Sequence, residues 1–329
     1  PTGVLRERAG SLVYAVIPAA TDPENKQALA WALQTMLANG ITSFTDAGIN
    51  DAQLRAYAAL ADEGKLKQRV RGCLTWRATS FGGPATPSEQ YIAARNLYAR
   101  ERFSPDCIKI VLDGVPTDGH TAAMVEAYAD AADSDGLRAR GLLMVPAGVL
   151  ARAVTDLDRQ GFTVKFHAAG DAAVRAGLDA IEAARRANGF SGNLHDVGHN
   201  SFVQMSDVAR GRALGATFEM SPYIWFPNPI IPDIAKAIGP ERMKRWIPVK
   251  DVIDAGALVV PGSDWNVVPS VNPWIAIETL VTRQKPGGGG EVLGAAERIT
   301  LQQAMDPVSY THLRAHETDS YLVCRLLLE

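Results

Sequence analysis

Residues 162–171 read FTVKFHAAGD, a stretch that joins the end of a predicted buried strand to the start of a helix. The apolar, β-branched run predicts the strand, His167 ends it, and the small residues that follow let the backbone turn. A helical pattern of apolar residues then runs from Asp171 to Gly189. A strand that leads directly into a helix is the repeating unit of a parallel α/β fold.

The same alternation continues in both directions, from about residue 22 to about residue 306. A helix is predicted to start at Asp22-Pro23, with Asp22 as its cap, and to stop at Asn39-Gly40. Seven strands are expected, at residues 41–48, 68–76, 107–114, 162–167, 193–199, 216–222 and 257–264. Alternating strands and helices indicate parallel βαβ units, and seven is one strand fewer than a (β/α)8 barrel contains. The sequence therefore predicts a TIM-type α/β barrel in a truncated form.

Composition excludes several classes of function. The chain has 329 residues, 47% of them hydrophobic, and a net charge of -3 with no basic run, which argues against a nucleic-acid surface. The sequence has no stretch of about 18 apolar residues, so it predicts no membrane span.

The three cysteines (Cys73, Cys107 and Cys324) are widely spaced and odd in number, which favours a reducing, cytoplasmic compartment over a disulfide framework. The first residues, PTGVLRERAG, have neither an initiator Met nor a signal-peptide layout, and a targeting segment could have preceded them.

Polar side chains lie at or near the ends of four predicted strands. They are Lys109 and Asp113, His167, His199, and Asp264. In a (β/α)8 barrel, catalytic residues gather at the carboxyl ends of the strands. A hydrolytic metal needs nitrogen and oxygen ligands with one position left open for water. Two histidines and an aspartate from separate strands could supply part of that set.

Each of these residues also has a plainer interpretation. A single histidine at a strand end is more often a hydrogen-bonded core residue, and Asp264 could cap the next helix. Lys109 faces the interior of the predicted barrel, where it could pair with Asp113. His195, four residues before the second histidine, is interpreted as structural, and Asp171 is as readily a helix cap as a catalytic residue. The joint pattern is stronger than any single member, because independent core residues need not all fall at strand ends.

Three segments are similar to the amidohydrolase superfamily: VKFHAAGDAAVRAGLDAIEAA, GHNSFVQMSDVARGRALGATFEMSP and DAGALVVPGSDWNVVPSVNPWIAIETLVTR. The branch they most resemble contains N-substituted formamide deformylase (amidohydrolase family 3). PTGVLRERA and IKIVLDGVPTDGHTAAM also resemble that branch. The resemblance covers nearly all of residues 1–306, and HAAGDAA and GSDWNV are its most specific parts.

The resemblance implies a barrel with a zinc or other divalent metal centre of one or two ions. His167 and His199 match the ligands that end the fifth and sixth strands of the family barrel. Asp264 matches the eighth-strand aspartate, which binds metal and shuttles protons. Lys109 matches the fourth-strand lysine, which is carboxylated in many relatives and bridges two metals. The implied reaction is hydrolysis of an amide or formamide-type C–N bond of a small molecule by metal-activated water.

The sequence departs from the family pattern in two places. It contains no His-x-His pair, which the family carries on its first strand and which would lie upstream of Pro1 with part of a flanking β-sandwich. Relatives also tend to have an acidic residue before the sixth-strand histidine, where this chain has Gly198. We therefore expect this chain, as a fragment, to have low or no activity.

Aromatic side chains near the last two strands could shape a substrate pocket. The predicted substrate-contacting residues are Tyr223, Trp225, Trp265 and Asp113, and Trp274 lies in the same region. Ordinary packing under long loops explains the aromatic residues equally well.

Two other functions fit the same residues. One is a metal-free amidohydrolase-like binding or scaffold protein, and the other is a class I aldolase that uses Lys109 as a Schiff base. We expect a small-molecule substrate and no nucleic-acid or membrane partner, and a homo-oligomer is compatible with the sequence.

The predicted domain boundary falls at residue 306. Residues 1–306 are interpreted as a metal-dependent hydrolase barrel that is incomplete at both ends. Residues 307–329 form a predicted non-native tail, since VSYTHLRAHETDSYLVCRLLLE resembles a translated sequencing adapter; a native amphipathic helix is the alternative. The chain is thus interpreted as a metagenomic reading frame clipped at both ends. His312, His316 and Cys324 are accordingly left out of any ligand set.

Overall fold

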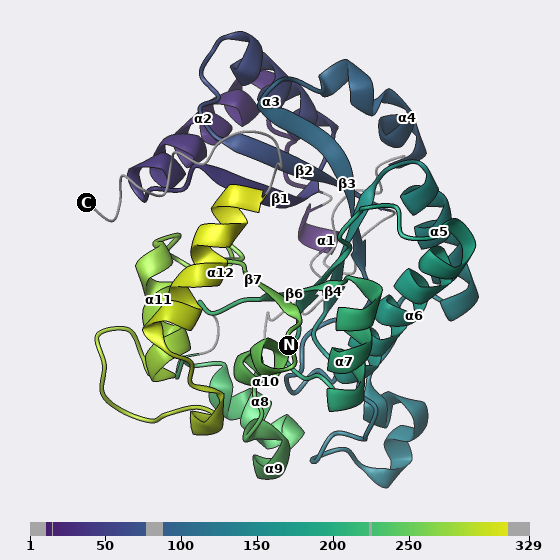
Figure 1. Cartoon of the computed structure of the whole chain (residues 1–329), viewed down its shortest axis with the longest axis vertical. Coiled ribbons are helices and arrows are strands. Elements are labelled where there is room, and N and C mark those ends of the chain that lie inside the picture. The colour runs from purple at the N-terminus through teal and green to yellow at the C-terminus, as the bar shows by residue number, and fades with distance from the viewer. Residues whose placement is uncertain (1–10, 15, 77–87, 224–225, 315–329) are drawn as a thin grey trace.

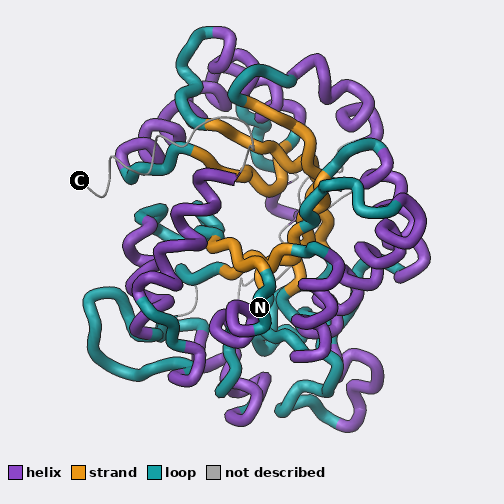
Figure 2. The backbone as a smooth tube through the Cα atoms, viewed as in Figure 1, coloured by secondary structure: helices purple, strands orange, loops and turns teal. Residues whose placement is uncertain are grey.

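The computed structural model describes residues 11–14, 16–76, 88–223 and 226–314. Its centre is a sheet of seven parallel strands paired in chain order. The strands are β1 (Ser43–Ile49), β2 (Arg69–Thr75), β3 (Phe103–Val111), β4 (Thr163–Ala168), β5 (Asp196–His199), β6 (Thr217–Met220) and β7 (Leu258–Pro261). The sheet curls into an arc with helices around it (Figures 1 and 2). This confirms the predicted α/β fold and its form as a partial barrel.

The helices follow the strands in alternation. They are α1 (Ser11–Tyr14), α2 (Asp22–Ala38), α3 (Asp51–Asp62), α4 (Ser88–Tyr98), α5 (Ala147–Arg159), α6 (Asp171–Asn188), α7 (Met205–Leu214), α8 (Ile231–Ile238), α9 (Pro240–Met243), α10 (Val249–Asp254), α11 (Pro273–Thr282) and α12 (Leu301–Arg314). Two 3-10 segments, η2 (Asp133–Arg140) and η3 (Ala295–Glu297), lie in the connections.

The start of α2 shows how local sequence sets the helix ends. The helix begins at Asp22, one residue before the predicted first helical position at Pro23, and the cap is Thr21. The Thr21 hydroxyl accepts the Glu24 N–H, and the Glu24 carboxylate accepts the Thr21 N–H, which makes a reciprocal capping box. Asp22 instead pairs with Arg55 of α3. The prediction of Asp22 as the cap was therefore wrong by one position.

Strand β3 is longer than predicted and has a proline inside it. The strand starts at Phe103, four residues before the predicted start at Cys107, and includes Pro105. The register with β2 shifts between Arg71 and Cys73, which lie opposite this segment. A bulge of this kind lets a strand accept proline, which has no N–H to donate.

The fully buried strand β4 lies at the centre of the core. All six of its residues are buried, as expected for a parallel strand that is covered on both faces. Helix α6 packs closely over it, because a Cβ at Gly177 would lie 3.2 Å from the Phe166 ring. This close packing fixes the position at which β4 ends and α6 begins, where His167 is found.

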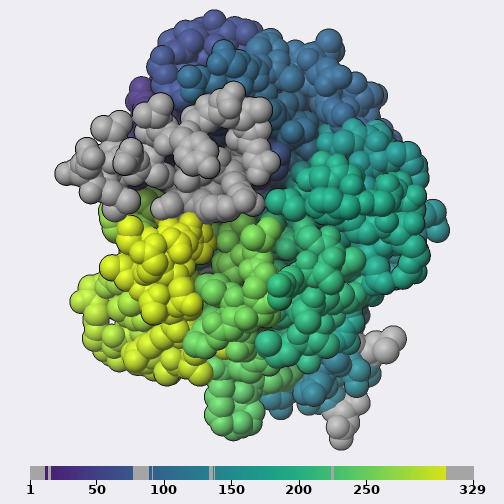
Figure 3. Space-filling view, viewed as in Figure 1, coloured from purple at the N-terminus to yellow at the C-terminus, as the bar shows by residue number. Residues whose placement is uncertain are grey.

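Strands β1 and β7 are the two ends of the arc. Within the described residues, each is paired with a neighbouring strand on one side only. Helix α12 contacts both of these strands (Figure 1), and its yellow surface adjoins the green surface of earlier segments (Figure 3). Helix α12 continues past the predicted boundary at 306, with Pro307 inside it. That boundary stays a prediction.

The prediction of reduced cysteines is wrong for one pair. Cys73 in β2 and Cys107 in β3 form a disulfide. The two residues are directly opposite in the strand register and almost fully buried. Sequence spacing could not show this, because cysteines 34 residues apart become neighbours only after folding.

No helix among the described residues has the length and apolar character needed to cross a bilayer.

The disulfide leads to a direct prediction. In unfolded protein that has not been reduced, peptides containing Cys73 and Cys107 should resist alkylation by iodoacetamide, and both should be labelled after treatment with dithiothreitol. Peptide mass spectrometry measures both states. Labelling of both cysteines before reduction would show that the pair is not oxidised in the purified protein.

Candidate active site

Two histidines, one buried and one partly buried, face each other at the carboxyl ends of neighbouring strands. His167 lies near the end of β4 and His199 is the last residue of β5, where the register pairs it with Ala168. Their ring centroids are 4.5 Å apart and the rings meet edge to face. The structure thus brings together the two residues that the sequence pattern selected as metal ligands.

Each histidine has one ring nitrogen in a hydrogen bond. His167 Nε2 lies 2.9 Å from the Gly114 carbonyl oxygen, and since a carbonyl only accepts, Nε2 carries the hydrogen. His199 Nδ1 lies 3.0 Å from the Ser221 hydroxyl of the segment after β6. These contacts orient both rings. Histidines that bind metals commonly have such a hydrogen bond on the ring nitrogen that does not bind the metal.

Both imidazoles are held neutral. Burial lowers the pKa of His167 well below its ordinary value, and the nearby His199 and Lys109 add to this. Burial also lowers the pKa of His199 to about 3, with further contributions from Lys109 and Lys165. Neutral imidazole is the form that binds a metal ion.

Lys109 and Asp264 belong to the same electrostatic environment. Burial and the neighbouring Lys165 lower the pKa of Lys109 to about 8, against the opposing effect of Glu219 and Asp264. Burial raises the pKa of Asp264, while Lys109 and Lys165 act to lower it. The chain places Asp264 three residues beyond β7, and the next helix, α11, is capped by Asn272. The alternative interpretation of Asp264 as a helix cap is therefore wrong.

A buried charge network beside the histidines was missed from the sequence. Lys165 Nζ lies 2.5 Å from Asp196 Oδ2 and 3.4 Å from Glu219 Oε2. Burial acts to lower the pKa of Lys165, but the two carboxylates outweigh this and raise it. The sequence does contain a signal for this network. Side chains alternate between the two faces of a strand, so Lys165, two residues before His167 in β4, is expected on the same face as His167.

The structure does not complete a metal shell. Among residues 11–14, 16–76, 88–223 and 226–314, no three His, Cys, Asp or Glu side chains lie close enough together to hold an ion. Two adjacent neutral imidazoles nevertheless fit a zinc-type ion, which prefers such nitrogen ligands. The donor set therefore fits part of a metal centre, with further ligands needed to complete it.

Asp113 accepts hydrogen bonds from the backbone, and its predicted substrate contact stays a prediction. The residue is fully buried. Its carboxylate accepts the backbone N–H groups of Ala123, Ala169 and Gly170, at 2.8–3.0 Å. These bonds join the loop after β3 to the turn after β4, against the earlier expectation that Asp113 would pair with a lysine. Burial raises the pKa of Asp113 to about 7, against the effect of these bonds.

The aromatic residues are not grouped in one pocket wall. Tyr223 is buried and donates its hydroxyl to the Val271 carbonyl, 3.3 Å away. Trp265 lies against Trp31 of α2, with ring centroids 5.9 Å apart. Trp274 is 65% exposed, and Trp225 lies outside the described residues. Their roles in substrate binding stay predictions.

His195 and Asp171 also have defined contacts. His195 Nδ1 accepts the Val164 N–H, and its Nε2 lies 3.1 Å from Asp158. This matches the structural role expected for it. Asp171 accepts the Val125 N–H at 2.7 Å, while Gly170 is the residue at the N-cap position of α6.

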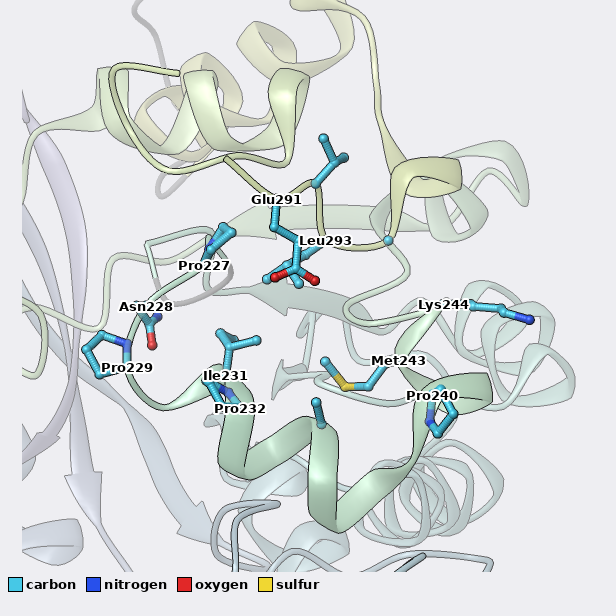
Figure 4. A pocket seen from close by; sticks show the side chains of 13 residues that line it. Pro227, Asn228, Pro229, Ile231, Pro232, Pro240, Met243, Lys244, Glu291 and Leu293 are labelled. Carbon is cyan, nitrogen blue, oxygen red and sulfur yellow. The ribbon is translucent and has the colours of Figure 1, made fainter. Parts of the chain in front are cut away.

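A groove lies elsewhere on the molecule. It has a volume of about 770 Å³ and runs between helices α8 and α9 and the segment 291–294 (Figure 4). Proline and aliphatic side chains dominate its lining, together with Lys244 and Glu291. None of the predicted metal-binding residues lines it, so the candidate site is defined by side-chain chemistry rather than by this groove.

Fold and site together define an α/β barrel protein with its polar residues at the carboxyl ends of the strands. The sequence matches the Amidohydrolase family (family 3) over residues 1–316. The chain therefore belongs to this family.

Two curated relatives are each 25% identical to the chain. LONG AFTER FAR-RED 3 of Arabidopsis thaliana matches 98% of the chain and 54% of its own length. YtcJ of Bacillus subtilis (strain 168) matches 86% of the chain and 50% of its own length. The chain thus spans about half the length of these relatives.

Solved structures support the fold. An uncharacterized metal-dependent hydrolase from Pyrococcus horikoshii OT3 has a TM-score of 0.73 at 20% identity, over 93% of this chain and 59% of that one. A protein of the same description from Pyrococcus furiosus has a TM-score of 0.68 at 21% identity, over 92% and 59%. At this level of identity the likeness concerns the fold alone.

Proposed function

We propose that this chain is the barrel of a metal-dependent hydrolase that cleaves an amide or formamide-type C–N bond in a small molecule. The observation that carries the proposal is the pair of neutral imidazoles of His167, which is buried, and His199, which is partly buried, 4.5 Å apart at adjacent strand ends. Family membership and the similarity to structures described as metal-dependent hydrolases support it.

The residues of the chain take distinct roles in this proposal. His167 and His199 hold the ion, and Lys109 is a further ligand if its amine is carboxylated. When bound, a divalent ion of this kind lowers the pKa of its water to about 7 and polarises a carbonyl group. Asp264 accepts a proton and delivers it to the leaving nitrogen, a role that suits a carboxylate whose pKa burial has raised.

Metal binding by the purified chain tests the proposal. After equilibration with added zinc the chain should bind the ion, although more weakly than a complete centre would. His167→Asn or His199→Asn should each lower the zinc content, measured by mass spectrometry of the metal, at least tenfold. His120→Asn is the matched control, because His120 pairs with Asp130 away from the site. Hydrolysis of a panel of simple amides and N-substituted formamides should be weak, since two ligands expected of the family are missing. Equal zinc content in all four proteins would refute the assignment of the histidines.

A metal-free binding or scaffold protein is the second candidate. It is favoured by the finding that the described residues bring no three ligand side chains together. If the chain has that function, its zinc content should be no higher than that of the His199→Asn variant, and circular dichroism should show that it is folded.

A further inference from the structure

Glu219 occupies the space beside the candidate ligand His199. Glu219 of β6 lies directly across the strand register from Gly198 of β5, the residue before His199. A Cβ built on Gly198 would overlap Glu219 Oε2, and one built on Gly262 would overlap Glu219 Oε1. The carboxylate therefore fills room that exists only because both of these positions are glycine.

A continuous line of hydrogen bonds joins this carboxylate to the histidine. The Ser221 hydroxyl donates to Glu219 Oε1 at 3.1 Å, and the same hydroxyl lies 3.0 Å from His199 Nδ1. Ser221 and Glu219 are both buried, with 1% and 5% of their surface exposed. Water therefore does not compete effectively for these groups.

The order of donors along this line follows from counting hydrogens. A hydroxyl has one hydrogen, and a carboxylate can only accept. When Ser221 gives its hydrogen to Glu219, its oxygen must accept from His199, so Nδ1 of His199 carries the ring hydrogen. The lone pair of the neutral ring is then on Nε2.

We propose that Glu219, acting through Ser221, is a positioning residue that fixes His199 as the Nδ1–H tautomer and so directs Nε2 to a metal ion. The inference rests on the proposed function only in that the group bound by Nε2 is taken to be a metal ion. The tautomer of His199 does not depend on that function.

Imidazole nitrogen-15 NMR of the metal-free full chain tests the tautomer directly. The His199 signals, assigned by their loss in His199→Asn, should show the Nδ1–H form in the wild type. Glu219→Gln has the same shape, but its amide can donate to Ser221 and free the hydroxyl hydrogen for Nδ1. This variant should therefore give the Nε2–H form or a mixture, and Ser221→Ala should give a mixture. Ser221→Thr keeps the hydroxyl and should restore the wild-type pattern.

Zinc affinity is the second readout, measured by competition with a chromophoric chelator. Glu219→Gln and Ser221→Ala should weaken binding by about 10–100-fold, the usual effect of removing a group that orients a ligand. Ser221→Thr should stay within about threefold of wild type. Ser201→Ala and Glu297→Gln make the same chemical changes at other buried positions and should leave His199 unchanged.

The outcomes separate this inference from the proposed function. A wild-type His199 in the Nε2–H form, or a tautomer that is the same in Glu219→Gln and Ser221→Ala, would overturn the inference even if zinc binds tightly. A change of tautomer in both variants without any zinc binding in the wild type would support the hydrogen-bond relay while refuting the metal site.

Discussion

Lys165→Met is expected to lower the free energy of unfolding by about 3–5 kcal/mol, the range for removing one partner from a buried ion pair. Lys165 is the positive group between the carboxylates of Asp196 and Glu219, and its side chain is only 10% exposed. Methionine has a similar length and fills the space, so the loss comes from charge rather than from a cavity. The buried carboxylate of Glu219 and the partly buried carboxylate of Asp196 would be left without their cation, and this is the costly state. Urea denaturation followed by tryptophan fluorescence measures the change as a shift in midpoint.

Two further variants show whether unpaired charge is the cause. Lys244→Met removes a lysine that pairs with Glu241 on the surface and should leave the midpoint unchanged, since exposed ion pairs contribute little. Combining Lys165→Met with Asp196→Asn and Glu219→Gln should recover much of the lost stability, because no buried charge then lacks a partner. A Lys165→Met protein as stable as the wild type would contradict this account of the network.

The position of the strands could be predicted because each carries its own local pattern. All seven occur where apolar, β-branched runs alternate with helical segments, and β4 followed by α6 reproduces the stretch from which the fold was predicted. The start of β3 was predicted four residues too late, and the missed part contains Pro105, a residue that is disfavoured within a strand. The proline is accommodated only because β2 shifts register opposite it, and this is a property of two strands rather than of one.

The site was predictable only in part, for a related reason. His167 and His199 lie at strand ends, and parallel strands bring their carboxyl ends together. Their positions in the predicted strands were therefore enough to predict that the two side chains lie close together. Asp113 also lies near the end of a strand, yet its carboxylate accepts hydrogen bonds from three backbone N–H groups of other segments. The role of Glu219 depends on a glycine in the adjacent strand, and no pattern within β6 reveals that.

Acid is expected to destabilise the protein through His195, which lies outside the metal site. His195 is fully buried, and burial lowers its pKa to about 4, with Arg185 adding to the effect and Asp158 opposing it. Its Nδ1 accepts the Val164 N–H, so protonation of the ring would break that bond. The unfolded chain binds the proton near the ordinary value of 6.5. Between these two values the unfolded state holds more protons, so stability falls as pH is lowered from about 6.5 to about 4 and levels off below that.

Comparison with His195→Gln isolates this contribution from the other titrating groups. Glutamine has a donor for Asp158 and an acceptor for the Val164 N–H, but it does not titrate. The difference in free energy of unfolding between wild type and His195→Gln should therefore change by about 3 kcal/mol from pH 7 to pH 4, with the wild type losing more. Urea midpoints measured at half-unit steps of pH give this difference, while contributions from groups that titrate alike in both proteins cancel. Parallel curves for the two proteins across this range would mean that His195 keeps its ordinary proton affinity in the folded state.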